Sequence, residues 1–294
     1  MSHPGTEAGA CQPGGCFPAA DTGQTVSDEG SPGTAEPGRT EAGRAVTGQK
    51  DTEAERTGES MSAVYKKELG QMFHSVIGYI YLSVFLLIAG GYFVMYNLLP
   101  GNGDISQFFS RLMSTVIFLL PMLTMRSYAE ERKMRTDQLL MSAPVSAISI
   151  ALGKFFAVLT IFAAGLSVTL VYVVILAVFG QFEPMTVLGN FIGMLVAASS
   201  FIAIGLLVSM LTENQIIACI VTYSVLLALW LVGFVETYLT NPLLKAAAGY
   251  LSVANRFAEF SMGIFDFSTI VYYLSITAFF LFLISVITEK RRQE

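Results

Sequence analysis

Two adjacent glutamates are the residues of this chain whose types and spacing come closest to catalytic chemistry. Glu130 and Glu131 precede Arg135 in the stretch RSYAEERKMRTDQLLMSAPVS, residues 126–146. Glutamate and histidine side chains inside a membrane can together activate a water molecule for hydrolysis by general base catalysis. The chain has only two histidines, and both precede this stretch. The residue types that would complete such a site are therefore missing.

The spacing Glu-Glu-x-x-x-Arg resembles the first motif of the CAAX-type intramembrane proteases, and without a later histidine we interpret the match as accidental. No apolar segment carries the G-x-S-x-G of a serine protease. Gly153-Lys154 is similar to the end of a P-loop, but Ile148 replaces the first glycine and Phe155 replaces the required Ser or Thr. We therefore expect no catalytic residue, no metal ligand and no cofactor in this chain, which is not predicted to be an enzyme.

The composition is that of an integral membrane protein with a polar N-terminal tail. Of the 294 residues, 53% are hydrophobic and 13% are charged. Ten of the 22 acidic residues fall in the first 60 positions, so the net charge of −5 arises largely there and gives no indication of nucleic-acid binding. From Val76 onward, several apolar runs reach the about 20 residues that a helix needs to cross a bilayer.

Residues 1–60 are predicted to be a disordered low-complexity tail, and residues 61–294 a six-span membrane domain. The tail contains eleven Gly and five Pro with few large apolar side chains, so it cannot bury enough surface to fold. Its Cys11 and Cys16 are interpreted as incidental thiols. Amphipathic sequence opens abruptly at Met61, which indicates that the functional domain begins near this residue.

Six transmembrane helices are predicted, which makes the fold all-α. Helices are favoured because a chain in lipid must satisfy its backbone hydrogen bonds internally. The alternation over ~10 residues that is typical of barrel strands is absent. The predicted spans are residues 77–99, 108–125, 154–179, 187–210, 215–234 and 268–287.

Basic residues predict the orientation of these spans. Lys and Arg cluster before the first span, between the second and third, and after the sixth, whereas the connections 101–107 and 181–186 carry none. Both termini and the stretch 126–146 are therefore expected in the cytoplasm. The connection 235–267 is expected outside, and its apolar content predicts short helices at the membrane surface.

One face of the fourth span has two interpretations. Asn190, Gly193 and Ser200 recur there at helical spacing. Close packing through small residues is the more common explanation, and the lining of a polar translocation path is the alternative. Ionisable side chains are scarce inside the spans, which argues against a proton relay. This scarcity favours a lipid-like or amphipathic cargo, or a mechanical role, over a small ion.

The stretch 126–146 combines charge with an apolar patch. Its first part, through Asp137, is predicted to extend the second span as a helix of mixed charge. Residues 139–141 (Leu-Leu-Met) then form an amphipathic turn, which Pro144 ends. An apolar patch rimmed by charge is typical of a helix that docks in a groove of a soluble partner. A surface helix that rests on lipid fits the residues equally well.

Sequence motifs favour the docking interpretation. The pattern S-Y-A-E-E-R-x-x-x-T-x-x-L-L-x-S-A-P-V-S, followed by L-G-K-F at 152–155, resembles the coupling region of ABC-2 type permeases. Residues 64–93 resemble the first helix region of that family, especially its gliding-motility-type branch, and residues 256–283 resemble the last span of that branch. The likeness covers roughly residues 61–294. Arg135 departs from it, because the family's motif has a small residue before the threonine.

The resemblance implies that the chain is a permease subunit of an ABC transporter. It would lie in the plasma membrane, which in bacteria is the cytoplasmic membrane. It would form a homodimer or pair with a related permease, and export its substrate. A separate cytoplasmic ATPase would bind ATP and Mg²⁺ and receive the coupling segment, residues 126–150, in its cleft. The resemblance assigns the docking surface to Thr136, Leu139, Leu140, Ser142 and Pro144, oriented by Glu131 and Arg132.

A non-transporting membrane scaffold is the alternative function. Such a subunit would anchor an ATPase or another cytoplasmic complex through the same docking surface without moving a substrate. The two hypotheses differ in whether a polar path exists at the dimer seam. Stimulation of ATP hydrolysis by a substrate is expected only for the transporter.

Overall fold

The computed structural model describes residues 61–101, 103–135, 145–179, 184–238, 249, 256–257 and 267–293. All of them belong to the unit Gly48–Glu294. The predicted tail, residues 1–60, and most of the connection 235–267 lie outside the described residues.

The predicted all-α fold is confirmed, because the described residues form helices and turns and no strand. Six helices are long and apolar enough to cross a membrane, so the chain is a multi-pass membrane protein. Each overlaps one predicted span, and the second and third extend furthest beyond the prediction, since hydropathy locates only the apolar part of a longer helix. The spans are Val76–Leu98, Ser106–Lys133, Ala147–Val178, Pro184–Leu211, Gln215–Gly233 and Phe267–Arg292.

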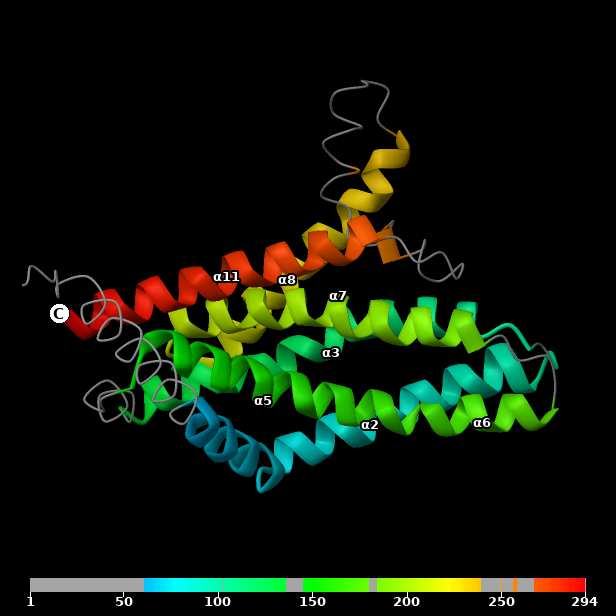
Figure 1. The fold of residues 1–294 in the computed structure, drawn as a ribbon, viewed down its shortest axis with the longest axis horizontal. Coiled ribbons are helices and arrows are strands. Elements are labelled where there is room, and N and C mark those ends of the chain that lie inside the picture. Colours follow the sequence, from blue (N-terminus) through cyan, green and yellow to red (C-terminus); the bar gives the residue numbers. More distant parts are fainter. Residues whose placement is uncertain are drawn as a thin grey trace, which may run out of the picture. The chain divides into compact units, whose positions relative to one another are not determined.

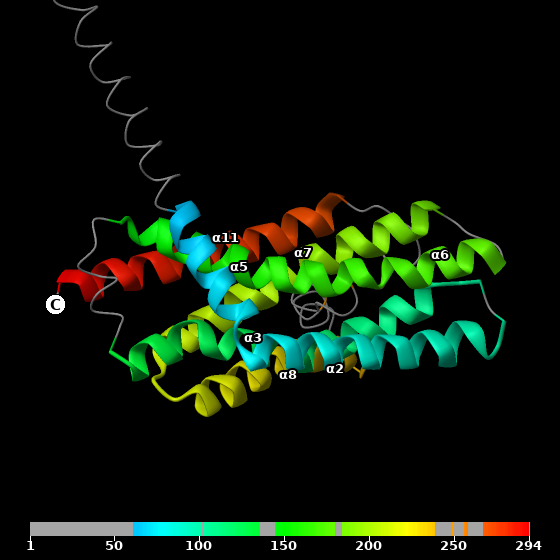
Figure 2. The same ribbon diagram turned by 90° about the horizontal axis from the view of Figure 1, so that it is seen from below.

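A separate helix, residues 61–73, precedes the first span. Figure 1 shows α11, α7 and α5 lying side by side, and Figure 2 shows α2 and α8 on the other side of the same bundle. The elements of the spans are α2 (Val76–Phe93) with the π-helical turn η1 (Val94–Leu98), α3 (Ser106–Lys133), α5 (Ala147–Val168) with α6 (Leu170–Phe179), α7 (Pro184–Leu211), α8 (Gln215–Tyr238) and α11 (Phe267–Gln293).

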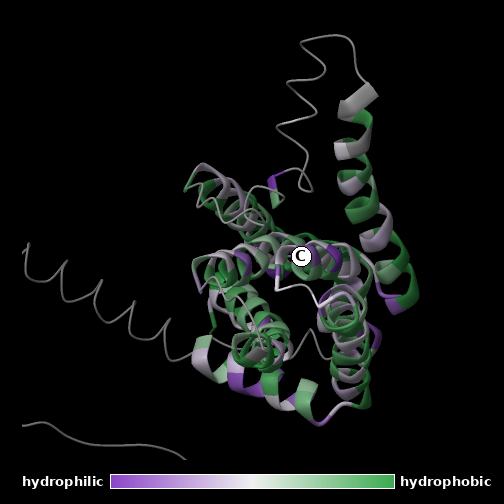
Figure 3. Cartoon of the chain, turned by 90° about the vertical axis from the view of Figure 1, so that its right-hand side faces the viewer, coloured by the Kyte–Doolittle hydropathy of each residue, from purple (hydrophilic) through white to green (hydrophobic). Residues whose placement is uncertain are grey.

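Helices α3 and α7 form the centre of the bundle. Helix α7 packs against α3, α11, α5 and α8, and α3 also packs against α2. Leu120 and Phe201 are among the fully buried side chains of this centre. In contrast, α2, α8 and α11 leave large apolar side chains exposed, such as Leu87, Ile216 and Phe282. Figure 3 shows the bundle as a whole largely in the green of apolar residues, as expected of helices that face lipid or another membrane helix.

A glycine allows α3 and α7 to approach each other closely. A Cβ atom at Gly205 of α7 would lie 2.3 Å from Oγ1 of Thr124 in α3. Thr124 is fully buried, and its hydroxyl donates to the carbonyl oxygen of Leu120 at 3.2 Å. A larger residue than glycine at 205 would therefore push the two central helices apart.

One end of the bundle collects the start of α2, the end of α3, the start of α5, the turn between α7 and α8, and the end of α11; we call it the basic end. Ten of the twelve Lys and Arg residues that the structure describes lie toward this end, and Arg111 and Arg256 lie toward the other. At the far end Arg256 packs over the ring of Tyr272, at 4.3 Å, beside the buried Phe257. Residues 256–257 of the connection 235–267 therefore pack against the bundle, and the predicted short helices at the membrane surface stay a prediction.

Candidate functional site

The structure describes only the borders of the predicted docking surface, and these borders lie at the basic end. Glu131 and Arg132 belong to the last turn of α3. The remaining residues of the prediction lie outside the described residues: Thr136, Leu139, Leu140, Ser142 and Pro144. What the structure supplies is how the chain is held on either side of residues 136–144.

Helix α3 ends before the predicted end of its helical extension beyond the second span. The sequence indicated a helix through Asp137, but α3 ends at Lys133 and Met134 is its C-cap. Arg135 follows with φ 54°, in the left-handed region. This conformation stops helices, and it favours glycine because other residues crowd their Cβ against the backbone. The one position at which the sequence departs from the permease motif is thus the position whose backbone prefers a small residue.

Glu131 faces inward, where it meets a buried lysine. The side chain of Lys154 in α5 is fully buried, and its Nζ lies 2.9 Å from Oε2 of Glu131 and 2.7 Å from Oε1 of Glu68 in helix 61–73. The same ammonium donates to the carbonyl oxygen of Ser127 at 2.9 Å. An ammonium has three N–H donors, so the cluster gives each donor an acceptor. It joins three elements that are distant in sequence: helix 61–73, α3 and α5.

The cluster is close to electrically balanced. Lys67 contributes a second cation, 3.5 Å from Oε1 of Glu131, so two lysines face two carboxylates. Lys154 also lies 4.9 Å from the centre of the Tyr128 ring. Burial raises the pKa of Glu68; Lys154 opposes this rise, and the neighbouring Glu131 adds to it. Because removing one partner of a buried ion pair leaves an uncompensated charge, Lys154 is the member on which the others depend.

Arg132 ties the end of α3 to the turn after α7. Its guanidinium donates to the carbonyl oxygen of Met210 and to Oε1 of Glu213, both at 3.0 Å. The contacts of Glu131 and Arg132 fall within the chain and hold the α3 side of the predicted docking segment. The orienting role predicted for these two residues stays a prediction, and these are the contacts through which they would exert it.

Ser209 of α7 forms hydrogen bonds with the backbone of α3 in the turn that precedes Arg132. Its hydroxyl accepts from the backbone N–H groups of Tyr128 at 3.2 Å and Ala129 at 3.1 Å, and donates to the carbonyl oxygen of Met125 at 2.9 Å. A side chain of one helix thus takes part in the hydrogen bonding of another helix's backbone. It fixes the register of α3 against α7 next to the buried ion cluster.

The α5 side of the segment is held as well. Ser146 is the N-cap of α5, and its hydroxyl accepts from the backbone N–H of Ser149 at 3.2 Å. Arg292, in the last turn of α11, donates to the carbonyl oxygen of Val145 at 3.1 Å. The described residues on both sides of 136–144 are therefore fixed to neighbouring helices.

The three residues of the predicted translocation path are all buried in α7. Nδ2 of Asn190 donates to the carbonyl oxygen of Thr186 at 2.8 Å, and its Oδ1 is buried without a partner in the described residues. The Ser200 hydroxyl donates to Ala197 in its own helix at 2.7 Å, and Gly193 is buried beside them. Helix packing accounts for these positions in one chain; the path itself stays a prediction.

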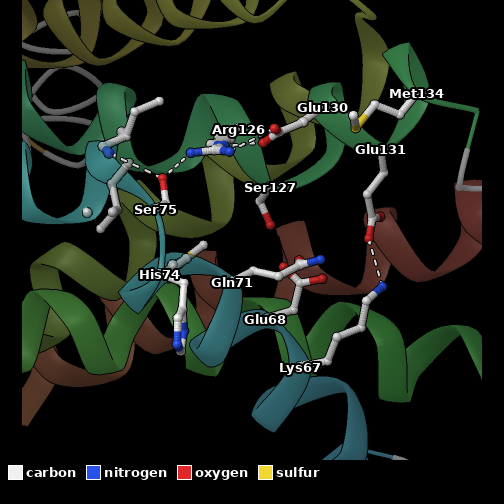
Figure 4. A pocket seen from close by; sticks show the side chains of 14 residues that line it. Lys67, Glu68, Gln71, His74, Ser75, Arg126, Ser127, Glu130, Glu131 and Met134 are labelled. Carbon is white, nitrogen blue, oxygen red and sulfur yellow. Dashed lines mark hydrogen bonds and ion pairs between the residues drawn. The ribbon is translucent and has the colours of Figure 1, made fainter.

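A cavity of about 680 Å³ lies beside the ion cluster. Its walls are helix 61–73, the start of α2 and the basic end of α3. Figure 4 shows the charged side chains that line it.

Arg126 donates to both carboxylate oxygens of Glu130 and to the hydroxyl of Ser75, the N-cap of α2. No group of three or more His, Cys, Asp or Glu side chains that could hold a metal ion occurs within the described ranges.

Sequence reasoning missed the role of Lys154 as a buried cation: it considered this residue in a failed P-loop, in the count of basic residues and in the L-G-K-F pattern. One signal was available. Val64, Glu68 and Met72 recur every fourth residue, which places a carboxylate on the apolar face of helix 61–73. A charge on such a face requires a partner, although nothing local identifies a lysine 86 residues away.

Comparison with known proteins identifies no relative: no protein-family model matches the chain, and no curated protein sequence is similar to it.

Proposed function

We propose that this multi-pass membrane protein is the permease subunit of an ABC transporter of the ABC-2 type. Residues 136–144 dock into a separate cytoplasmic ATPase, and two such chains, or this chain and a related permease, form the membrane part of the complex. ATP and Mg²⁺ bind to the partner ATPase. The substrate is carried out of the cytoplasm across the plasma membrane.

The attachment of both borders of the docking segment is the observation that carries this proposal. Lys154 links the α3 border to α5 and to helix 61–73, Arg132 links it to the turn after α7, and Arg292 holds the α5 border. A segment that transmits a push must be fixed to the helices it moves, because a loosely tethered loop would absorb the displacement. Closure of the ATPases would thereby move α3 and α5 together and switch the path between the two halves.

The distribution of basic residues supports a cytoplasmic position for this segment. Ten of the twelve Lys and Arg residues that the structure describes lie toward the basic end. Under the positive-inside rule, this end faces the cytoplasm, where an ATPase can reach it.

Co-purification of the partner tests the docking. Wild type, Leu140→Asp and Leu99→Asp are expressed in the native host, solubilised and affinity-purified. Proteins that bear a P-loop are identified by mass spectrometry. Leu99 is 77% exposed near the opposite end of the bundle, so Leu99→Asp controls for a leucine-to-aspartate change far from the predicted docking segment. The proposal expects the ATPase with wild type and Leu99→Asp but not with Leu140→Asp. Equal recovery with all three would refute the docking.

Reconstitution of the purified complex separates the transporter from the scaffold alternative. The transporter hypothesis expects ATP hydrolysis in proteoliposomes to rise with the lipid fraction extracted from the native membrane. If neither native lipids nor other extracts change the rate of ATP hydrolysis, the scaffold hypothesis is favoured, in which the chain anchors the ATPase without moving a substrate.

A further inference from the structure

The cavity beside the ion cluster contains a polar group that no other group satisfies. Ser127 is 5% exposed, and its hydroxyl has no hydrogen-bond partner within the described residues. Figure 4 shows this hydroxyl and the Gln71 side chain directed into the space between α3 and helix 61–73. A buried hydroxyl without a partner is destabilising, and an incoming polar ligand would relieve that cost.

The charges on the cavity wall favour a ligand that carries both signs. Three acidic residues and two basic residues line it: Glu68, Glu130 and Glu131, and Lys67 and Arg126. The carboxylate of Glu130 would repel a purely anionic ligand, and the guanidinium of Arg126 would repel a purely cationic one. A carboxylate can accept several hydrogen bonds, so Glu130 retains capacity for an ammonium beside Arg126.

Arg126 can bind an anion without releasing Glu130. Its guanidinium uses Nε and Nη2 on Glu130 and Nη1 on Ser75. A guanidinium carries five N–H donors, so two remain after these three bonds. Guanidinium groups bind phosphate strongly. The wall thus offers an acceptor for an ammonium and donors for a phosphate on adjacent turns of α3.

The position of the cavity favours a lipid as the source of that headgroup. Helix 61–73 is amphipathic: Val64 and Glu68 are buried while Lys66 and Lys67 are exposed. The buried face packs on α5, where Val64 lies against Gly153 and Glu68 pairs with Lys154. The helix ends just before the first span begins at Val76, so the cavity is near the end of that span. The apolar Met72, Ile77 and Leu123 also line the cavity, and they can contact the glycerol and the first methylenes of a lipid.

We propose that this cavity binds a phospholipid headgroup in which a primary ammonium accompanies the phosphate, as in phosphatidylethanolamine. The ammonium donates to Glu130 and Ser127, and the phosphate accepts from Arg126. This inference does not depend on the proposed transport function, since it concerns a site on the single chain and needs no ATPase.

Thermal unfolding of the full chain in dodecyl maltoside tests the proposal. Short-chain (dihexanoyl) phosphatidylethanolamine, phosphatidylcholine and phosphatidylglycerol are titrated separately, with glycerophosphoethanolamine as the headgroup without chains. We expect a saturable rise in Tm with phosphatidylethanolamine and a clearly smaller one with the other three. Phosphatidylcholine lacks N–H donors, phosphatidylglycerol lacks the ammonium, and the soluble headgroup lacks the apolar contacts.

The variant Ser127→Ala tests whether the Ser127 hydroxyl binds the lipid or only stabilises the fold. Because the hydroxyl has no partner in the ligand-free protein, its removal should leave the ligand-free Tm unchanged or raise it. The apparent affinity for phosphatidylethanolamine should fall about fivefold, which corresponds to about 1 kcal/mol. Glu130→Gln should weaken it at least as much. Ser285→Ala, at a buried serine of α11 that does not line the cavity, is the matched control and should respond like wild type.

Three results would overturn the proposal. The first is an equal response to all three lipids, which indicates nonspecific solvation by lipid. The second is an equal response to glycerophosphoethanolamine, which assigns the site to a soluble ligand. The third is an unchanged affinity in both Ser127→Ala and Glu130→Gln.

Discussion

The two ends of the bundle are held together by different kinds of contact. At the basic end, Lys154, Arg132 and Ser209 make short polar contacts between helices. At the opposite end, aromatic rings of α2, α3 and α6 pack on one another, with Phe93 stacked on Tyr172 at 4.9 Å between ring centres. Polar contacts in a buried site demand particular partners and geometry, whereas aromatic packing tolerates small shifts and substitutions of similar volume.

This difference indicates how the bundle would respond to a force. The basic end should move as one body, because a displacement of α3 relative to α5 separates buried charges. The aromatic end can adjust by sliding rings past one another. A partner that acts on residues 136–144 would therefore act on the end that transmits displacement best.

Loss of Lys154 should give the largest effect. Lys154→Met leaves Glu68 and Glu131 buried without their shared cation, and we expect a loss of about 3–5 kcal/mol in the free energy of unfolding. Titration of the dodecyl maltoside-solubilised protein with SDS measures it. Phe93→Leu, at the aromatic end, is the comparison and should cost less than about 1.5 kcal/mol. Equal losses would remove the distinction between the two ends.

A larger residue at the contact between α3 and α7 should give the next largest loss in the free energy of unfolding. In Gly205→Ala the new methyl meets Thr124, and the overpacking should cost about 1–3 kcal/mol. Gly91→Ala is the matched control, because nothing lies within 4 Å of a Cβ there, and it should be neutral or slightly stabilising. The same SDS titration measures both variants, and a neutral Gly205→Ala would show that the central helices are not tightly packed.

Arg135 should be a site of stabilisation. With φ at 54°, Arg135→Gly removes the strain of a left-handed side chain and should raise the free energy of unfolding by about 1 kcal/mol. Arg135→Ala retains the Cβ and serves as the control, with no gain expected. If both variants gain equally, removal of the charge rather than backbone relief is the cause.

The pH dependence of the ion cluster should give the smallest effect. Because the folded pKa of Glu68 is raised above its ordinary value of 4.5, the folded state holds this proton more tightly than the unfolded state. Stability from this group is therefore present at low pH and is lost as pH rises from about 4.5 through the folded pKa. Lys154, Glu131 and Lys67 face Glu68 and remain in the comparison variant, Glu68→Gln.

The measurement is the difference in unfolding free energy between wild type and Glu68→Gln as a function of pH. We expect wild type to lose stability relative to the variant as pH rises through that window. If wild type instead gains stability relative to Glu68→Gln as pH rises, the Lys154 ion pair, rather than burial, dominates the environment of Glu68.

The spans were predictable from the sequence because hydropathy and helix length are local properties. The ion cluster was not, since Glu68 and Lys154 meet only after the chain has folded across two spans. The early end of α3 was missed because a left-handed Arg135 is rare, and residue type alone favoured helix there. The face that carries Asn190 and Ser200 has the same pattern of small and polar residues under either interpretation, so the sequence could not distinguish packing from a path.

Site-specific photocrosslinking tests most directly whether residues 136–144 dock an ATPase. A benzoylphenylalanine at position 140, and at position 99 as the control, is activated by light in native membranes, and mass spectrometry identifies the crosslinked peptides. The account predicts that position 140 crosslinks to a chain that contains G-x-x-x-x-G-K-[ST] and that position 99 does not. Crosslinks from position 140 only to lipid or to this same chain would contradict it.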